Sequence, residues 1–116
     1  MRDDEIKYSI EEVVSFCKTY EICIIEREKT MDFIYKTNQS FESVKQEIRQ
    51  LRVEYACAEP EPDYGENRKG YVYQFKKIVF DQYWAYIKLK IKYKKIIVVL
   101  SFHEEEYEYE NNRDAN

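Results

Sequence analysis

Histidine, cysteine and proline are scarce in this chain, and each scarcity narrows what the protein can be. The single histidine is His103, and the three cysteines lack the spacing of metal ligands, so we expect no zinc site and no cofactor. Cys17, Cys23 and Cys57 are an odd number and read as buried, reduced thiols of a cytosolic protein. Both prolines lie in Ala58–Gly65, which we interpret as a loop.

Long apolar runs are also lacking. No window approaches the roughly 18 consecutive apolar residues that a membrane-spanning helix needs. The N-terminus, Met1–Glu5, is polar and acidic, unlike a secretory signal. We therefore expect one cytoplasmic domain over residues 1–106 that does not contact a membrane, followed by an acidic, disordered tail over residues 107–116.

Charge is distributed unevenly along the chain. The net charge is −4, yet residues 67–102 contain a single acid, Asp81. The same segment holds nine basic residues: Arg68, Lys69, Lys76, Lys77, Lys88, Lys90, Lys92, Lys94 and Lys95. This segregation predicts a local electropositive surface on an otherwise acidic protein.

Three consecutive strands are predicted over residues 71–80, 84–92 and 96–103. The middle strand alternates, with Ala85, Ile87, Leu89 and Ile91 on one face and Trp84, Tyr86, Lys88, Lys90 and Lys92 on the other. Alternation with a period of two is typical of a strand that buries one face only. The lysine-bearing face is therefore predicted to stay open.

Pairing these strands brings the candidate residues into one row. A hairpin that turns over Lys94-Lys95 pairs Ile91 with Val98, Leu89 with Leu100, Ile87 with Phe102, Lys90 with Val99, Lys88 with Ser101 and Tyr86 with His103. A slip by one residue would turn the lysines into the core, which favours this register. A second hairpin that turns over Asp81-Gln82 places Lys77 beside Tyr86. The row Lys77, Tyr86, His103 is the predicted site.

The N-terminal half reads as helical. Ser9 and Glu12 have capping-box spacing, which predicts a helix over about residues 10–20. A charged turn, Glu26–Lys29, precedes a short helix over Met31–Lys36. Ser40 then caps a third helix whose apolar stripe is Phe41, Val44, Ile48 and Leu51. The short apolar run Ile22–Ile25 is either a strand or the buried end of a connection.

These elements predict an α+β domain. A helical half (residues 9–57) is followed by a loop (58–69) and a sheet (70–104). We expect the N-terminal helices to pack on one face of a C-terminal antiparallel meander, the face that carries Ile87, Leu89 and Ile91. Neither half could bury its apolar face alone, so the loop is not a domain linker.

At this point the sequence resembles a known family. Tyr86–Ile91 followed by Val98–Glu104 is similar to the corresponding strands of the motility quorum-sensing regulator (MqsR-like) toxins. So are Tyr71–Lys76 and the upstream order of helices that ends in a segment with Leu51, Tyr55 and Pro60. These toxins belong to the RelE-like group of small bacterial ribonucleases. The similarity is specific over residues 70–104 and looser over residues 9–65.

The resemblance implies a RelE-like fold and an mRNA interferase toxin that cuts messenger RNA without metal. It also implies an RNA substrate and a cognate antitoxin protein as partners, with the ribosome as a further candidate. The family's functional tyrosine matches Tyr86, and the basic residue after Ser-Phe on its last strand matches His103. A polar or basic first-strand position falls between Gln74 and Lys77 and is not fixed further.

The chemistry of metal-free RNA cleavage suits these residue types. The ribose 2′-OH must lose a proton, the phosphorane must be stabilised, and the leaving 5′-oxygen must gain a proton. A histidine can serve as acid or base near neutral pH, lysines stabilise negative charge, and a tyrosine can donate a proton or stack a base. The candidate catalytic residues are Tyr86, His103 and Lys77; the candidate RNA-binding residues are Lys76, Trp84, Lys88, Lys90 and Lys92.

Each of these residues also has a simpler interpretation. His103 could be a strand-end residue without a role, and the lysines could only solvate the wet face of the sheet. Trp84 could stack a base or pack under the Pro60–Pro62 loop. The alternative function is a non-catalytic nucleic-acid- or protein-binding module, such as a phage-type regulator or inhibitor. A purely structural interaction protein is the third hypothesis.

Overall fold

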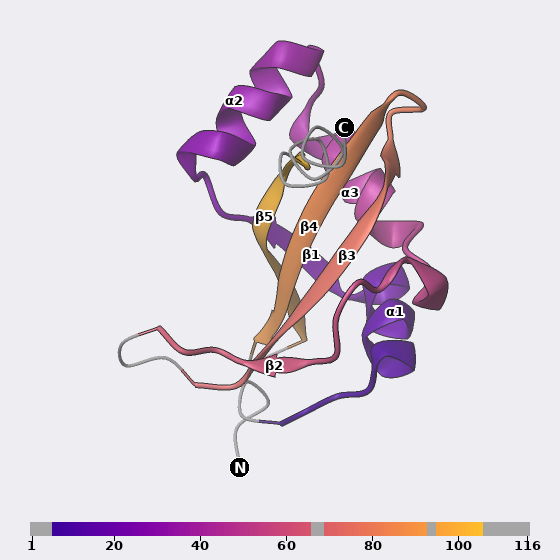
Figure 1. Cartoon of the computed structure of the whole chain (residues 1–116), viewed down its shortest axis with the longest axis vertical. Coiled ribbons are helices and arrows are strands. Elements are labelled where there is room, and N and C mark those ends of the chain that lie inside the picture. The colour runs from indigo at the N-terminus through magenta and orange to yellow at the C-terminus, as the bar shows by residue number, and fades with distance from the viewer. Residues whose placement is uncertain (1–5, 66–68, 93–94, 106–116) are drawn as a thin grey trace, which may run out of the picture.

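The computed structural model describes residues 6–65, 69–92 and 95–105 and has the predicted α+β class. Its helices and strands follow one another as Figure 1 shows. Their bounds are α1 Ile10–Thr19, β1 Glu21–Ile24, α2 Glu28–Thr37, α3 Phe41–Arg49, a 3-10 turn η2 Val53–Tyr55, β2 Glu61–Pro62, β3 Tyr71–Val79, β4 Tyr83–Lys92 and β5 Ile96–Glu104. The predicted tail over residues 107–116 lies outside the described residues.

The helices begin at the polar residues that the sequence indicates. Ser9 accepts a hydrogen bond from the Glu12 backbone N–H, and the Glu12 side chain accepts one from the Ser9 N–H, so the capping box of α1 is complete. Ser40 caps α3 by accepting a hydrogen bond from the Ser43 backbone N–H at its side-chain oxygen. Helix α2 begins at Glu28, inside the segment predicted as a charged turn, and ends at Asn38 in the left-handed region.

The sheet is mixed rather than a pure antiparallel meander. Its strand order is β1-β5-β4-β3-β2, and β3, β4 and β5 form the predicted meander at its centre. The run Ile22–Ile25 contributes strand β1, which pairs in parallel with β5. The two residues of β2 pair with the start of β3, so the predicted loop 58–69 contains a short edge strand.

Strands β4 and β5 keep the predicted register at one end only. The pairs Ile87–Phe102, Lys88–Ser101 and Tyr86–His103 are confirmed. A β-bulge then shifts the ladder, so Leu89 pairs with Val99, Lys90 with Val98 and Ile91 with Ile97. The three pairs predicted beyond that point, Ile91–Val98, Leu89–Leu100 and Lys90–Val99, are therefore wrong.

Leu100 is the extra residue of this bulge, and it changes the face of the sheet on which the residues after it lie. Before it, Ile97 and Val99 are buried in the core; after it, Phe102 is. Continuous alternation from Val99 would turn His103 toward the helices. The bulge therefore lets β5 bury Ile97, Val99 and Phe102 together and still present His103 on the opposite face, next to Tyr86.

The register between β3 and β4 differs by one residue from the prediction. Val79 pairs with Tyr83, and the chain turns over three residues, with the Gln82 N–H donating to the Val79 carbonyl. Phe80 and Asp81 have φ values of 53° and 59°, as the central residues of a type I′ turn require. Consequently Lys76 pairs with Tyr86, and Lys77 pairs with Ala85 on the helix side.

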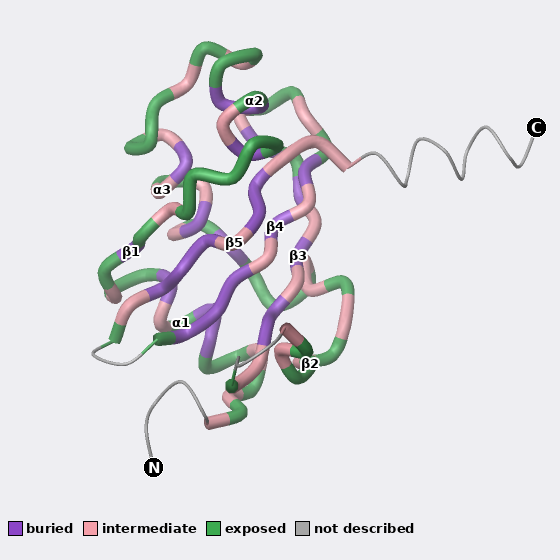
Figure 2. The backbone as a smooth tube through the Cα atoms, turned by 90° about the vertical axis from the view of Figure 1, so that its left-hand side faces the viewer, coloured by how far each residue is buried: buried purple, intermediate pink, exposed green. Residues whose placement is uncertain are grey.

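One core joins all three helices to one face of the sheet. Val13 and Cys17 of α1, Ile48 of α3 and Phe33 of α2 are buried with the inward residues of β3, β4 and β5. Figure 2 shows the buried residues concentrated along the central strands, with exposed residues in the connections. Among the described residues, no helix is long and apolar enough to cross a membrane.

Helix α2 covers the part of β5 that β1 does not reach. Strand β1 ends at Ile24, and beyond it the Phe102 N–H donates to Thr30 Oγ1 of α2 at 3.2 Å. Lys36 at the other end of α2 bonds Glu104 at 2.6 Å. Helix α2 therefore satisfies an edge donor of the sheet and lies beside the strand end that carries His103 (Figure 1).

Candidate functional site

The open face of the sheet is defined here by the side chains opposite the helices: Gln74, Lys76 and Ile78 of β3; Trp84, Tyr86, Lys88, Lys90 and Lys92 of β4; and Ser101 and His103 of β5. One row across it reads Lys76, Tyr86, His103. The Tyr86 and His103 rings lie 5.7 Å apart between centroids. The predicted pairing of these two residues is confirmed, and Lys76 replaces Lys77 as the third member.

These residues line a hollow of about 440 Å³. Gln74, Lys76, Tyr86 and His103 come from the sheet, Glu105 continues the line of β5, Lys29 comes from α2, and Cys57 and Ala58 from the segment after η2. Cys57 is held at this edge because its N–H donates to the Gln74 carbonyl at 3.0 Å. The hollow therefore brings together five parts of the chain that are distant in sequence.

Tyr86 is a protonated hydrogen-bond donor in this hollow. Its hydroxyl donates to Gln74 Oε1 at 2.7 Å. Burial, and then the negative charge that Cys57 and Glu105 can carry nearby, raises the pKa of Tyr86 to about 12. The phenol thus keeps its proton at neutral pH and can donate it to a ligand if the ligand replaces Gln74.

The backbone defines which nitrogen of His103 is available. Nδ1 lies 3.0 Å from the Glu104 carbonyl oxygen. A carbonyl oxygen only accepts, so Nδ1 carries the hydrogen of this bond and Nε2 remains for proton transfer. His103 and Lys29 also border a second, smaller hollow of about 170 Å³ beside α2.

Acidic side chains pair with two of the open-face lysines. Lys76 Nζ lies 2.8 Å from Glu105 Oε2, and Lys90 Nζ lies 2.7 Å from Asp63 Oδ2. The Lys90 side chain is 5% exposed, because the segment that carries Asp63 reaches over the open face. Lys90, predicted to bind RNA, is therefore engaged in a buried pair with Asp63 and anchors this segment to the sheet.

Lys77 is a structural residue on the helix side of the sheet. Its ammonium bonds Glu47 Oε1 at 2.8 Å, and the second carboxylate oxygen of Glu47 accepts from the Phe80 N–H. Both side chains are largely buried, at 8% and 17% exposed. Lys77 therefore does not lie on the open face, and Lys76 occupies the position beside Tyr86 that was predicted for Lys77.

Trp84 lies at the hairpin end of the open face, next to the row of Lys76, Tyr86 and His103. It is 38% exposed and pairs with Ile78, which is 50% exposed. β2 pairs with Val72, six residues from Ile78 and so about 20 Å along β3. Trp84 therefore does not pack under the Pro60–Pro62 loop, and its indole is accessible beside the hollow.

Lys88 and Lys92 are the remaining predicted phosphate ligands. Both lie on the open face, Lys88 partly exposed and Lys92 exposed. Within the part of the chain that the structure describes, neither forms an ion pair. They leave a smaller positive surface than the sequence suggests, because Lys77 and Lys90 are engaged in buried pairs.

Two residues of the hollow were missed as candidates. Glu105 follows His103 by two residues, so alternation alone would have placed both on one face. Lys29 had no such signal, since it joins the hollow only through the packing of α2 against β5. Alternation along β3 also indicated the buried position of Lys77, because Tyr73, Phe75 and Val79 lie on the same side of the strand and are buried.

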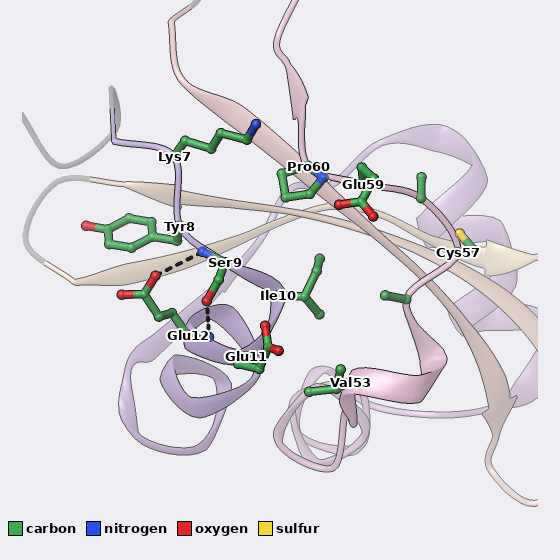
Figure 3. A pocket seen from close by; sticks show the side chains of 12 residues that line it. Lys7, Tyr8, Ser9, Ile10, Glu11, Glu12, Val53, Cys57, Glu59 and Pro60 are labelled. Carbon is green, nitrogen blue, oxygen red and sulfur yellow. Dashed lines mark hydrogen bonds between the residues drawn. The ribbon is translucent and has the colours of Figure 1, made fainter.

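A larger hollow, of about 900 Å³, lies between the start of α1 and the segment after η2. Figure 3 shows Ser9 and Glu12 hydrogen-bonded to each other at its edge, and Glu11 and Glu59 also line it. Ser9 and Glu12 are thus used in capping α1. Lys7 of this rim lies 5.8 Å from the centroid of the Tyr71 ring. The larger hollow offers no acid–base pair comparable to Tyr86 and His103 in the first hollow.

The thiols and the acids do not form a metal site in the described residues. No three His, Cys, Asp or Glu side chains in those ranges form a group that could hold a metal ion. All three cysteines are free, but only Cys17 is buried, so the expectation of buried thiols is wrong for Cys23 and Cys57. Partial desolvation by its neighbours raises the pKa of the Cys57 thiol although the residue is exposed, so it is not an activated thiolate.

The chain was compared with protein-family models, with curated proteins and with solved structures, and none of the three comparisons gives a match. The similarity to MqsR-like toxins therefore stays a prediction from the sequence. The function has to be argued from the hollow itself.

Proposed function

We propose that this protein is a metal-independent endoribonuclease of the mRNA interferase type that cuts RNA by attack of the ribose 2′-OH on the adjacent phosphate. The observation that carries the proposal is the row Lys76–Tyr86–His103 in one accessible hollow. It combines an imidazole, a neutral phenol and an ammonium, the three types of group that such cleavage needs.

Each residue has a role that follows from its contacts. His103 transfers a proton through Nε2, because Nδ1 is held by the Glu104 carbonyl. Tyr86 donates a hydrogen bond to a phosphoryl oxygen, since its raised pKa keeps it neutral. Lys76, and Lys29 from the rim, stabilise the negative charge of the phosphorane.

The rest of the open face would bind the RNA strand. Lys88 and Lys92 would contact phosphates, and the accessible indole of Trp84 would stack a splayed base. An antitoxin protein that covers this face and a cytoplasmic location belong to the same proposal. So does the ribosome as an additional partner.

The test is incubation of the purified protein with total RNA in EDTA. We expect cleavage in the chelator, and a loss of about two to four orders of magnitude in rate for His103→Ala, the usual contribution of a positioned acid or base. His103→Lys should keep part of the activity, because an ammonium can still donate a proton. Cleavage by His103→Ala at the parental rate would contradict the proposal.

The second candidate is a non-catalytic binding module on the same face. The pairing of Lys76 with Glu105 and of Lys90 with Asp63 favours it, because both lysines already have carboxylate partners. A module of this kind would bind an oligonucleotide or a protein without cutting RNA. Growth arrest on overexpression, relieved by His103→Ala, supports the nuclease; harmless expression supports the module.

A further inference from the structure

We propose that Glu105 is the general base of this site and His103 its general acid, an inference that rests on the proposed RNA cleavage. The cleavage needs two proton transfers, one from the 2′-OH and one to the 5′-oxygen. One histidine can perform both only in successive steps. A carboxylate beside it would divide the two transfers between two groups.

The backbone directs Glu105 into the hollow. Glu104 pairs with Ala85, and the Glu105 N–H donates to the Trp84 carbonyl at 2.8 Å, so the ladder continues past the end of β5. Glu104 then faces α2, where it bonds Lys36, and Glu105 lies on the face of His103. Two residues along a strand separate their Cα atoms by about 6.6 Å, which leaves room for a phosphate between the side chains.

Lys76 positions the Glu105 carboxylate. The Lys76 ammonium lies 2.8 Å from Glu105 Oε2, and the Glu105 side chain is 9% exposed. A carboxylate has about four lone-pair positions and can accept several hydrogen bonds at once. The groups that face Glu105 in the hollow are Lys76 of β3, Tyr86 of β4, His103 of β5, Lys29 of α2 and Cys57.

The charge of Glu105 acts on Tyr86, which lies in the same row as His103. It is among the causes that raise the pKa of Tyr86, after burial and Cys57. By contrast, Glu104 pairs with Lys36 in the smaller hollow, which His103 and Lys29 also border but Lys76 and Tyr86 do not line. The two neighbouring glutamates therefore differ in position and provide a matched pair for mutagenesis.

The reaction balances without any further reagent. A Glu105 oxygen takes the proton of the 2′-OH, and the 2′-oxygen forms a bond to phosphorus. The bond from phosphorus to the 5′-oxygen breaks, and its electron pair takes the Nε2 proton of the His103 imidazolium, which becomes the neutral imidazole with its hydrogen on Nδ1. The products are a 2′,3′-cyclic phosphate and a 5′-hydroxyl, and Glu105 returns its proton to His103 through solvent.

The test compares Glu105→Gln with Glu104→Gln on a short single-stranded RNA and on the DNA of the same sequence, which binds but lacks the 2′-OH. Gln accepts a hydrogen bond from Lys76, so the hollow should persist. We expect Glu105→Gln to lower kcat by about 10²–10⁴-fold and to leave DNA affinity unchanged or higher. The acid-side fall of the pH–rate profile should disappear in this variant. Glu105→Asp should restore part of kcat, and Glu104→Gln, which keeps the backbone carbonyl that holds His103, should lose far less kcat than Glu105→Gln.

Three results would overturn the inference. Parental kcat in Glu105→Gln would show that another group is the base, while the nuclease proposal would stand. If Glu105→Gln lost DNA affinity in proportion to kcat, Glu105 would only position Lys76 and would not be the base. Absence of cleavage by the parent, with intact DNA binding, would remove the nuclease proposal and this inference together.

Discussion

Lys77 should be essential for stability and dispensable for chemistry, and Lys77→Met tests this directly. The Lys77 and Glu47 side chains are 8% and 17% exposed and lie 2.8 Å apart. Removing one partner of a buried ion pair typically costs ~3–5 kcal/mol, because the other charge is left without compensation. Glu47 keeps the hydrogen bond from the Phe80 N–H and some contact with water, so we expect about 3 kcal/mol, the low end of that range.

Urea unfolding measures this loss. With a slope of about 1.5 kcal/mol per molar urea for a domain of this size, the midpoint should fall by about 2 M. The double variant Lys77→Met/Glu47→Gln should recover most of the loss, since it removes both charges and keeps an acceptor for Phe80. Lys92→Met, an exposed lysine on β4, is the control and should stay within ~0.5 kcal/mol of the parent.

The same variants separate structure from chemistry. Without urea, and at a temperature at which Lys77→Met is folded, the rate at which this variant cleaves RNA should match that of the parent. If Lys77→Met is as stable as the parent and has lost cleavage, the assignment of Lys77 to the helix side is refuted. Such a result would restore the row Lys77–Tyr86–His103 as the site.

Three further outcomes are expected. Deleting Leu100 removes the bulge and exchanges the faces of Phe102 and His103, so the variant should lose cooperative thermal unfolding or cleavage, whereas Leu100→Ala keeps the residue count and should retain both. Lys88→Gln with Lys92→Gln should reduce the slope of log affinity for single-stranded RNA against log salt by about 1.4, or ~0.7 per lost phosphate contact; an unchanged slope would mean that these lysines only solvate the sheet. Burial raises the pKa of Tyr86 to about 12 from about 10 in the unfolded chain, so the contribution of Tyr86 to stability should be constant below pH 10 and fall as pH rises from 10 to 12; Tyr86→Phe should remove that part of the fall.

Local patterns predicted the elements well because local forces decide them. The polar side chains of Ser9 and Ser40 satisfy free N–H groups at helix starts, and these helices begin where the sequence indicates. The period of two in β4 matches its burial from Tyr83 to Leu89. The strand bounds agree within a residue for the same reason: side-chain alternation is a property of the strand itself.

Register depends on turns and bulges, which alternation does not describe. The three-residue turn at Phe80 places Lys76, not Lys77, beside Tyr86, because Phe80 packs on Phe33 and Phe102 in the core. The bulge at Leu100 allows β5 to bury residues on both sides of it and keep His103 outward. Each change is a single residue, and each reverses which lysine or which apolar residue faces solvent.

The sequence by itself determined that this chain is an α+β domain with a strand face rich in tyrosine and lysine, and that Tyr86 and His103 are neighbours on it. The fold class and the composition of this face follow from periodicity, which is a local quantity. The predicted pairing of Tyr86 with His103 is correct because the bulge at Leu100 offsets the one-residue difference in register nearer the turn. Only the tertiary structure decided that Lys29 joins them and that Asp63 and Glu47 pair with Lys90 and Lys77 in buried surroundings. Those contacts join segments that are distant along the chain, and the free energy of burying a charge depends on what packs against it, which no local pattern contains.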